Sequence, residues 1–512
     1  MIETRALSGD DLTLGDVWAV AVEGGGAVLS DRAREKMTAA RALVERAAHG
    51  SSEHTYGVNT GFGRFVSKSI PDELTEELQV RLLRSHACGV GDPYPPEIVR
   101  AAMLLRANAL AKGYSGACIE TVELLIELVN RGVLPYVPSR GSVGASGDLA
   151  PLAHLALPLI GEGEVWADGK RIPGAEGLAA VGLDPVRLQA KEGLSLVNGT
   201  QFMAAFGSLG LVRARRLARV ADCACALSLE ALQGSRTGYM PQVHALRPLK
   251  GQGDSAANVL RLLEGSAINE AHRWCDKVQD AYSLRCAPQV HGASRDLLDY
   301  CEATFSVEIN AATDNPLVLV EEEMLVSAGN FHGQPLAFAL DAMAMAVAEL
   351  ASISERRTER LVNPNLSDGL PAFLTSDGGL NSGFMIPQYV AAALVSENKS
   401  LCHPASVDSI PTSAGQEDHV SMGNASGLKA WQVLANSELA VAIELLAAAQ
   451  GVEFLAPLEP GAGARATHDF VRTLSPRLRD DRPLSGDIEA VAAAIRDGSL
   501  LAAVESEVGA LA

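Results

Sequence analysis

The sequence has no stretch of concentrated positive charge. Its 512 residues contain 62 acidic and 42 basic side chains, which gives a formal net charge of −20 at pH 7. Nucleic acids and anionic membrane surfaces are bound through clustered lysine and arginine side chains, because these neutralise phosphates. The composition therefore argues against both partners and favours a small molecule.

The sequence also has few features that would direct a chain into or across a membrane. Apolar stretches such as the one around residues 342–350 are interrupted before they reach the length of a membrane span, here by Asp341, Glu349 and Glu355. The first residues, MIETRALSGDDLTLGDVW, contain early acids and no basic-then-apolar leader. We expect no transmembrane helix and a cytoplasmic location.

The eight cysteines form no C-x-x-C pair and no spacing typical of a disulfide framework. Cys223 and Cys225 lie two positions apart on a predicted helix, so their side chains would face different sides and make poor joint metal ligands. Reduced thiols are predicted, and no metal.

Helix-forming residues dominate the chain, and β-branched runs are short. Three long segments rich in Ala, Leu and Glu carry many small side chains, which is typical of closely packed helices: residues 336–362, 386–401 and 428–454. The pattern predicts a mainly α fold with a long central helical bundle.

The first two hundred residues are richer in glycine and proline, with loop-like stretches at 55–64, 88–96 and 135–148. The Asp-Gly pair within residues 165–178 predicts a small hairpin. We therefore predict a loop-rich N-terminal region over residues 1–205 and a helical bundle over residues 206–512, joined in one continuous body.

The most informative stretch is PSRGSVGASGDLAP, residues 138–151, a glycine-rich turn that leads into an apolar helix. Ser146 or Asp148 could simply cap that helix. Because Gly147 has no Cβ, however, its nitrogen can also approach the Ala145 carbonyl carbon closely enough for ring closure. Loss of water from the ring and from Ser146 would then leave an electron-poor alkene, next to the positive end of a helix dipole.

Two other motifs that resemble this stretch are absent from it. It contains no Gly-Lys-Ser/Thr of a phosphate-binding P-loop. The glycines of Gly144-Ala145-Ser146-Gly147-Asp148 also do not match the G-x-S-x-G turn of serine hydrolases. A nucleotide site and a simple serine nucleophile are both disfavoured.

The run GSVGASGDLAPLAH resembles the signature of the aromatic amino acid ammonia-lyases, and the resemblance extends from the TYGVNTGFG segment at Thr55 to about Met422. It implies a fumarase/aspartase-like helical scaffold without a shielding insertion. It also implies a 4-methylidene-imidazol-5-one group formed autocatalytically from Ala145, Ser146 and Gly147, with no external cofactor. The family pattern further implies a homotetramer whose active sites draw residues from three subunits.

Residues that match the family's motifs take their expected roles from the resemblance. Tyr56 is expected to be the base that removes the β-hydrogen, which requires the site to favour its phenolate over an ordinary pKa of about 10. Arg285 is expected to bind the substrate carboxylate, for which a guanidinium offers a bidentate fork. Tyr282 is expected to support proton transfer or to position the electrophile.

Other matching positions are expected to contact the prosthetic group or the substrate. Asn198 and Gln279 match active-site positions, although each alone would more often form a cap or a turn. Phe331, in AGNFHGQ, is expected near the imidazolone or the substrate ring. The neighbouring His332 is not assigned a catalytic role, because a loop histidine beside an aromatic residue is at least as often structural.

Selectivity for histidine is indicated by four residues. The Ser85-His86 pair, Glu417 and Met385 each resemble the histidine enzymes of the family. A carboxylate can accept a hydrogen bond from an imidazole N–H but would face only an apolar edge in phenylalanine. The sequence therefore predicts conversion of L-histidine into trans-urocanate and ammonia.

Several departures from the family pattern leave alternatives open. Gly415 stands where Asn is usual, His291 stands where Met is common, and residues 235–245 differ from the typical sequence. A tyrosine ammonia-lyase or a tyrosine 2,3-aminomutase stays possible, and so does a non-catalytic helical assembly protein. A fumarase-like lyase is disfavoured because no G-S-S-x-M-P-x-K loop is found.

Overall fold

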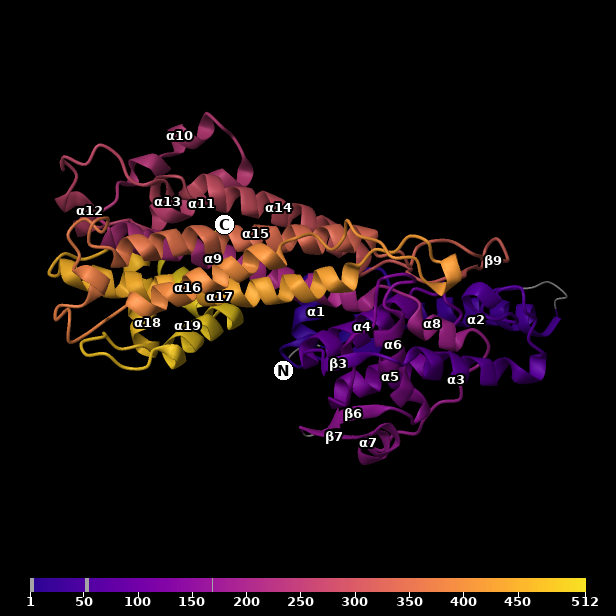
Figure 1. Ribbon diagram of the computed structural model, residues 1–512. Coiled ribbons are helices and arrows are strands. Elements are labelled where there is room, and N and C mark those ends of the chain that lie inside the picture. Colours follow the sequence, from indigo (N-terminus) through magenta and orange to yellow (C-terminus); the bar gives the residue numbers. More distant parts are fainter. Residues whose placement is uncertain (1–3, 51–54, 168) are drawn as a thin grey trace. The chain divides into compact units, whose positions relative to one another are not determined.

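The computed structural model describes residues 4–50, 55–167 and 169–512 (Figure 1). The chain packs as two compact units. The first contains Met1–Val212, Glu302–Asp341 and Pro404–Leu428, and the second contains Arg213–Cys301, Ala342–His403 and Lys429–Ala512. The first unit thus includes two segments from late in the sequence. The sequence had instead predicted a single boundary after residue 205. That the units form one continuous body stays a prediction.

The first unit combines short and medium helices with small sheets. Its helices are α1 (Leu14–Ala21), α2 (Asp31–Gly50), α3 (Thr75–His86), α4 (Pro96–Ala111), α5 (Ile119–Arg131), α6 (Leu149–Ala156), α7 (Gly174–Ala180) and α8 (Glu192–Val197). Its strands are β1 (Arg5–Leu7), β2 (Ala27–Leu29), β3 (Val90–Pro93), β4 (Leu134–Pro135), β5 (Pro138–Arg140), β6 (Glu164–Ala167), β7 (Lys170–Pro173), β8 (Leu317–Leu319) and β9 (Met324–Val326). They pair as β1-β2, β3-β5, β4-β6-β7 and β8-β9.

The predicted hairpin is present but shorter than expected. β6 and β7 pair antiparallel, from Glu164 opposite Pro173 to Ala167 opposite Lys170, and α7 begins directly afterwards at Gly174. Asp168, the first residue of the expected turn dipeptide, lies outside the described residues. The hairpin therefore ends at Pro173, and residues 174–178 are helical.

The buried Arg106 on α4 organises the centre of the first unit. Its guanidinium donates hydrogen bonds to the carbonyls of Ser195 and Asn198 and, at 2.9 Å, to the side chain of Gln201. Those acceptors lie on α8, directly after it, and at the start of α9 (Gln201–Ala231). A fully buried guanidinium must satisfy its donors internally, so this contact fixes the turn that carries Asn198.

The second unit is almost entirely helical in its described residues. It contains the later parts of α9, α15 (Gln334–Val362) and α17 (Gly423–Val452) and the first part of α14 (Ala287–Glu308). Its other helices are α10 (Pro241–Ala245), α11 (Lys250–Leu262), α12 (Ala267–Ala271), α13 (Tyr282–Arg285), α16 (Met385–Leu401), α18 (Ala462–Leu474), α19 (Ser485–Asp497) and α20 (Ser499–Val508). The predictions of a mainly α fold and of three long helices, α15, α16 and α17, are confirmed.

Buried polar pairs join the long helices of the second unit, which lie side by side in Figure 1. Arg213 on α9 donates to Glu438 on α17 through Nε at 2.9 Å and Nη2 at 2.7 Å. Asn398 on α16 donates to the Ser437 hydroxyl at 3.2 Å. Because the ion pair is buried, losing one partner would leave the other charge unpaired and away from water. The pair therefore holds its two helices in register.

One helix of the described residues, α15, is long and apolar enough to cross a membrane by length and composition alone. Asp341, Glu349 and Glu355 therefore do not interrupt the stretch as fully as the sequence suggested. However, 72% of its most apolar window is buried inside the protein. A buried core helix accounts for this composition.

The ion pair between Arg213 and Glu438 gives a test of the helical core. We expect Glu438→Ala to lower the free energy of unfolding by about 3–5 kcal/mol, because Arg213 would stay buried without its counter-charge. Urea unfolding followed by circular dichroism measures the change. Glu77→Ala, which breaks the exposed pair with Arg81, is the control and should leave the midpoint unchanged; an equal shift in both variants would contradict the assignment.

Candidate active site

The Ala145-Ser146-Gly147 tripeptide lies in the loop between β5 and α6. Gly147 has a φ of +75°, and a Cβ on this residue would lie 2.0 Å from the carbonyl oxygen of Gly199. The following amide, that of Asp148, donates to the same Gly199 oxygen at 2.7 Å. Only glycine fits both this conformation and this close backbone approach.

Asp148 secures the loop to the start of α9. Its Oδ2 accepts hydrogen bonds from the amides of Phe202 at 2.9 Å and Met203 at 3.0 Å. Burial raises the pKa of this carboxyl to about 7, although both amides oppose the rise. The prediction that Ser146 or Asp148 caps α6 is wrong: Asp148 stands at the N-cap of α6 but its side chain caps α9 instead.

Five of the residues selected from the sequence line one cavity of about 1000 Å³ in the first unit: Tyr56, His86, Ser146, Asn198 and Glu417. They come from segments up to 361 positions apart, between residues 56 and 417. Ala145 and Gly147 are buried on either side of Ser146, which is itself half-buried. The serine side chain is therefore the part of the tripeptide that the cavity reaches.

Tyr56 is half-buried, and its hydroxyl oxygen accepts a hydrogen bond from the amide of Gly63 at 3.3 Å. Burial raises the pKa of Tyr56, the negative charge of Glu417 raises it further, and the Gly63 amide opposes the rise. The expectation that this environment favours the phenolate is not met by the described residues of one chain. A positive charge would have to come close for Tyr56 to act as a base.

His86 ends α3 and has a defined tautomer. Its Nδ1 lies 3.0 Å from the Leu82 carbonyl oxygen and 2.9 Å from the Ser85 hydroxyl. A carbonyl only accepts, so Nδ1 carries the proton, and burial lowers the pKa of the ring. The neutral imidazole therefore offers Nε2 as a hydrogen-bond acceptor.

Glu417 reaches the tripeptide directly. Its Oε1 accepts a hydrogen bond from the Ser146 hydroxyl at 3.3 Å, while its Oε2 accepts one from the Thr412 hydroxyl at 2.7 Å. Thr412 and Glu417 also pair through their backbones. Thr412 thus holds one oxygen of the carboxylate, and the other oxygen faces Ser146.

Asn198, at the end of α8, has one satisfied and one unsatisfied polar atom. Its Nδ2 donates to the Asn315 carbonyl oxygen at 3.0 Å, whereas its buried Oδ1 has no hydrogen-bond partner among the described residues. Buried polar atoms are almost always bonded, so the Oδ1 of Asn198 is free to accept a hydrogen bond from a further group.

Four selected residues, Gln279, Tyr282, Arg285 and Met385, belong to the second unit. Arg285 packs with its guanidinium carbon 4.6 Å from the centre of the Tyr282 ring, and its Nε donates to the Asp280 carbonyl at 2.9 Å. Gln279 and Arg285 line a cavity of about 610 Å³ there. Tyr282 is 72% exposed and Met385, the first residue of α16, is half-buried.

Phe331 lies in the first unit, in the loop between β9 and α15, and is half-buried. It is not among the described residues that line the cavity of Ser146. Its expected place near the imidazolone or the substrate ring stays a prediction.

The sequence reasoning missed the residues that support this cavity. Asn315 supplies the carbonyl that orients Asn198 across 117 positions. Thr412 holds Glu417 from five positions away, in a turn whose shape no local pattern indicated. The Thr-x4-Glu spacing is too common to serve as a signal, so only the fold reveals these contacts.

The family model for aromatic amino acid lyases matches residues 12–473. The chain belongs to the aromatic amino acid lyase family. This lyase is 55% identical to the histidine ammonia-lyase of Gloeobacter violaceus over 99% of this chain and 98% of that protein. The crystal structure of histidine ammonia-lyase from Trypanosoma cruzi aligns with a TM-score of 0.92 at 46% identity, covering 99% and 96% of the two chains. That of tyrosine aminomutase from Streptomyces globisporus aligns with a TM-score of 0.94 at 38% identity, covering 100% of both.

Membership of this family implies a methylidene-imidazolone prosthetic group, and the residues of this lyase fit one. The tight backbone at Gly147 suits a ring between residues 145 and 147, since a side chain there would meet Gly199. Asn198, whose buried Oδ1 is unpaired among the described residues, lines the same cavity as Ser146. Asn198, Tyr56 and Glu417 are therefore the residues of the first unit that would surround the group.

Replacing Gly147 tests this geometry. We expect Gly147→Ala to reduce ammonia release from amino acid substrates below detection, because the added Cβ would collide with the Gly199 carbonyl and displace the tripeptide. Gly132→Ala is the matched control, since Gly132 has a φ of +68° but nothing within 4 Å of its Cβ position. Full activity in Gly147→Ala would contradict the proposed need for this approach.

Proposed function

We propose that this lyase eliminates ammonia from L-histidine to give trans-urocanate. The observation that carries the proposal is the presence of two hydrogen-bond acceptors, His86 Nε2 and the Glu417 carboxylate, in the cavity that contains Ser146. The relatives from Gloeobacter violaceus and Trypanosoma cruzi bear the name of that activity. Family and cavity therefore favour the same substrate.

The two acceptors match the donors of histidine better than those of other aromatic amino acids. An imidazole N–H and the ammonium group can both donate, one to each acceptor, whereas phenylalanine would leave a half-buried carboxylate facing an apolar ring. Leaving such a polar group unpaired lowers the affinity for the wrong substrate strongly. Met385 of the second unit is proposed to line the pocket at the substrate side chain.

We propose that the tripeptide matures by itself, without an external cofactor. The Gly147 nitrogen forms a bond to the Ala145 carbonyl carbon, and the carbonyl oxygen leaves as water with the amide protons of Gly147 and Ser146, which leaves a carbon–nitrogen double bond. Ser146 then loses its α-proton and its hydroxyl as a second water, which forms the carbon–carbon double bond. Departure of the Ser146 hydroxyl would also free Glu417 Oε1, which holds it at 3.3 Å. The same carboxylate oxygen thereby becomes available to the substrate.

When formed, the prosthetic group supplies the electrophile of the reaction. In the elimination the β-carbon–hydrogen and α-carbon–nitrogen bonds break, a carbon–carbon double bond forms and ammonia leaves. Tyr56 takes the β-proton, Asn198 offers its unpaired Oδ1 to the bound groups, and Tyr282 and Gln279 of another subunit assist.

Arg285 is proposed to bind the substrate carboxylate through two parallel hydrogen bonds. We further propose a homotetramer in which Arg285, Tyr282, Gln279 and Met385 of one subunit complete the cavity of another, as the family resemblance implies. An approaching guanidinium would also lower the pKa of Tyr56, which burial raises. A cytoplasmic location stays a prediction.

A tyrosine ammonia-lyase or a tyrosine 2,3-aminomutase is the second candidate. The tyrosine aminomutase structure shares the fold over the whole chain at 38% identity, which is the observation that favours it. A mutase shares the electrophile and differs in holding its product for re-addition of ammonia, a difference of release rather than of fold.

The proton-transfer role of Tyr56 predicts a pH dependence. The base form is required, and burial raises the pKa, so kcat/KM for L-histidine should increase as pH rises above neutrality. Tyr56→Phe should lower kcat by about 10²–10⁴-fold and abolish this increase. If kcat/KM of Tyr56→Phe still rises with pH, the rise belongs to another titrating group.

Substrate selectivity is tested with L-histidine, L-tyrosine and L-phenylalanine supplied separately, followed by absorbance of the conjugated acid and by ammonia release. We expect urocanate from histidine alone, and a Glu417→Gln variant that loses activity on histidine: with the amide oxygen on Thr412, the amide nitrogen would present a donor to the donor of the substrate. Coumarate or β-tyrosine from tyrosine would instead establish the second candidate. An absence of any product would favour the non-catalytic assembly.

A further inference from the structure

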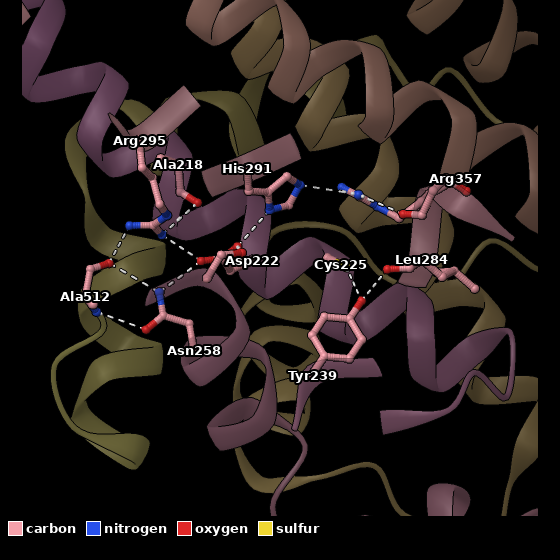
Figure 2. Close-up of polar contacts among 12 residues, drawn as sticks. Ala218, Asp222, Cys225, Tyr239, Asn258, Leu284, His291, Arg295, Arg357 and Ala512 are labelled. Carbon is pink, nitrogen blue, oxygen red and sulfur yellow. Dashed lines mark hydrogen bonds and ion pairs between the residues drawn. The ribbon is translucent and has the colours of Figure 1, made fainter. Parts of the chain in front are cut away.

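Two departures from the family pattern, His291 and the segment 235–245, contribute to two sets of buried contacts in the second unit, which end on the adjacent residues Ser283 and Leu284 (Figure 2). His291 on α14 is completely buried. Its Nδ1 lies 2.7 Å from Oδ1 of Asp222 on α9, and its Nε2 lies 3.4 Å from Nη1 of Arg357 on α15. The ring therefore bridges a carboxylate and a guanidinium.

The two partners fix the protonation of this ring. A carboxylate accepts, so Nδ1 carries a proton, and a guanidinium only donates, so Nε2 does not. Burial also lowers the pKa of His291. His291 is thus a neutral bridge between Asp222, which Arg295 also pairs with at 2.6 Å, and Arg357.

Arg357 connects this bridge to the segment that contains Arg285. Glu444 on α17 accepts its Nε at 2.5 Å and its Nη2 at 2.8 Å, which leaves Nη1 for other partners. Nη1 has two hydrogens: one faces His291, and the other is donated to the Ser283 carbonyl oxygen at 3.3 Å. Glu444 sets the plane of the guanidinium, and within that plane His291 and Ser283 share the two hydrogens of Nη1. Without the histidine, one of these buried hydrogens would lose its partner, and the guanidinium could shift away from the Ser283 carbonyl.

The carbonyl of Leu284, the residue after Ser283, also accepts a hydrogen bond from a buried side chain. Tyr239, within residues 235–245, donates its hydroxyl to the Leu284 carbonyl oxygen at 2.5 Å, and Cys225 lies 3.4 Å from that hydroxyl (Figure 2). α13 is only four residues long. A helix of that length is not stable by itself, so these bonds decide its position.

We propose that His291 is a positioning residue for substrate binding: by holding Arg357 Nη1 against the Ser283 carbonyl, it orients α13 so that Arg285 meets the substrate carboxylate. The inference rests on the proposed function of Arg285. It assigns a task to a buried histidine that touches neither substrate nor prosthetic group.

The test compares two variants with the full-length wild-type enzyme. His291→Met fills the space without a hydrogen-bonding nitrogen and should raise KM for L-histidine about tenfold, the effect of one lost hydrogen bond, with a smaller change in kcat. His291→Gln can donate to Asp222 and accept from Arg357, so it should restore the wild-type KM. Histamine, which lacks the carboxylate, should inhibit the wild type and His291→Met with the same inhibition constant.

Gln450→Leu is the control for a general loss of stability. Gln450 is equally buried in the second unit and bonds the Leu374 and Leu478 carbonyls, far in sequence from α13. It should lower the melting temperature without changing KM. If His291→Met does not fold, His291→Asn, which is polar but too short to reach both partners, takes its place.

Three outcomes overturn part of the account, and they are distinguishable. An unchanged KM in folded His291→Met overturns the positioning role while wild-type activity upholds the proposed function. Equal weakening of histidine and histamine overturns it too, because the effect would then be general. No turnover of histidine by the wild type overturns the proposed function and the inference that rests on it.

Discussion

The close approach of Gly147 to the Gly199 carbonyl is the constraint on which the site depends. It fixes the tripeptide loop against the turn before α9. The buried guanidinium of Arg106 donates a hydrogen bond to the Asn198 carbonyl in the same turn. The Asp148 carboxylate accepts one from the Phe202 amide at the start of α9. Both contacts are costly to break, since each would leave a buried polar group unpaired. The backbone geometry that the proposed ring closure requires is therefore provided by the packing of the folded chain.

The electrostatics of the cavity follow from what faces Ser146. Glu417 contributes a negative charge, His86 is neutral, and Tyr56 has a raised pKa. The first unit thus presents hydrogen-bond acceptors suited to an ammonium group and an imidazole N–H, while the guanidinium suited to a carboxylate, Arg285, belongs to the second unit. A zwitterionic substrate carries groups that suit both kinds of partner. In the proposed mechanism Arg285 comes from another subunit, so assembly of several subunits is part of the proposal.

Much of this arrangement could be predicted from the sequence, and the missing parts have a common physical reason. Long segments rich in Ala, Leu and Glu predicted α15, α16 and α17, and the glycine-rich run identified the tripeptide. Family motifs selected Tyr56, His86, Asn198 and Glu417, which meet in one cavity. Local patterns did not indicate that Asp148 caps α9 rather than α6, that Thr412 orients Glu417, or that residues 302–341 and 404–428 join the first unit. Each of these depends on contacts between distant segments.

The central claim is that the chain makes its own electrophile from residues 145–147. Peptide mass spectrometry of a wild-type preparation that is active on L-histidine tests it most directly. The account predicts that the peptide containing Ala145, Ser146 and Gly147 is lighter than its sequence mass by two water molecules, with all other peptides at full mass. A full-mass peptide in an active preparation would contradict it.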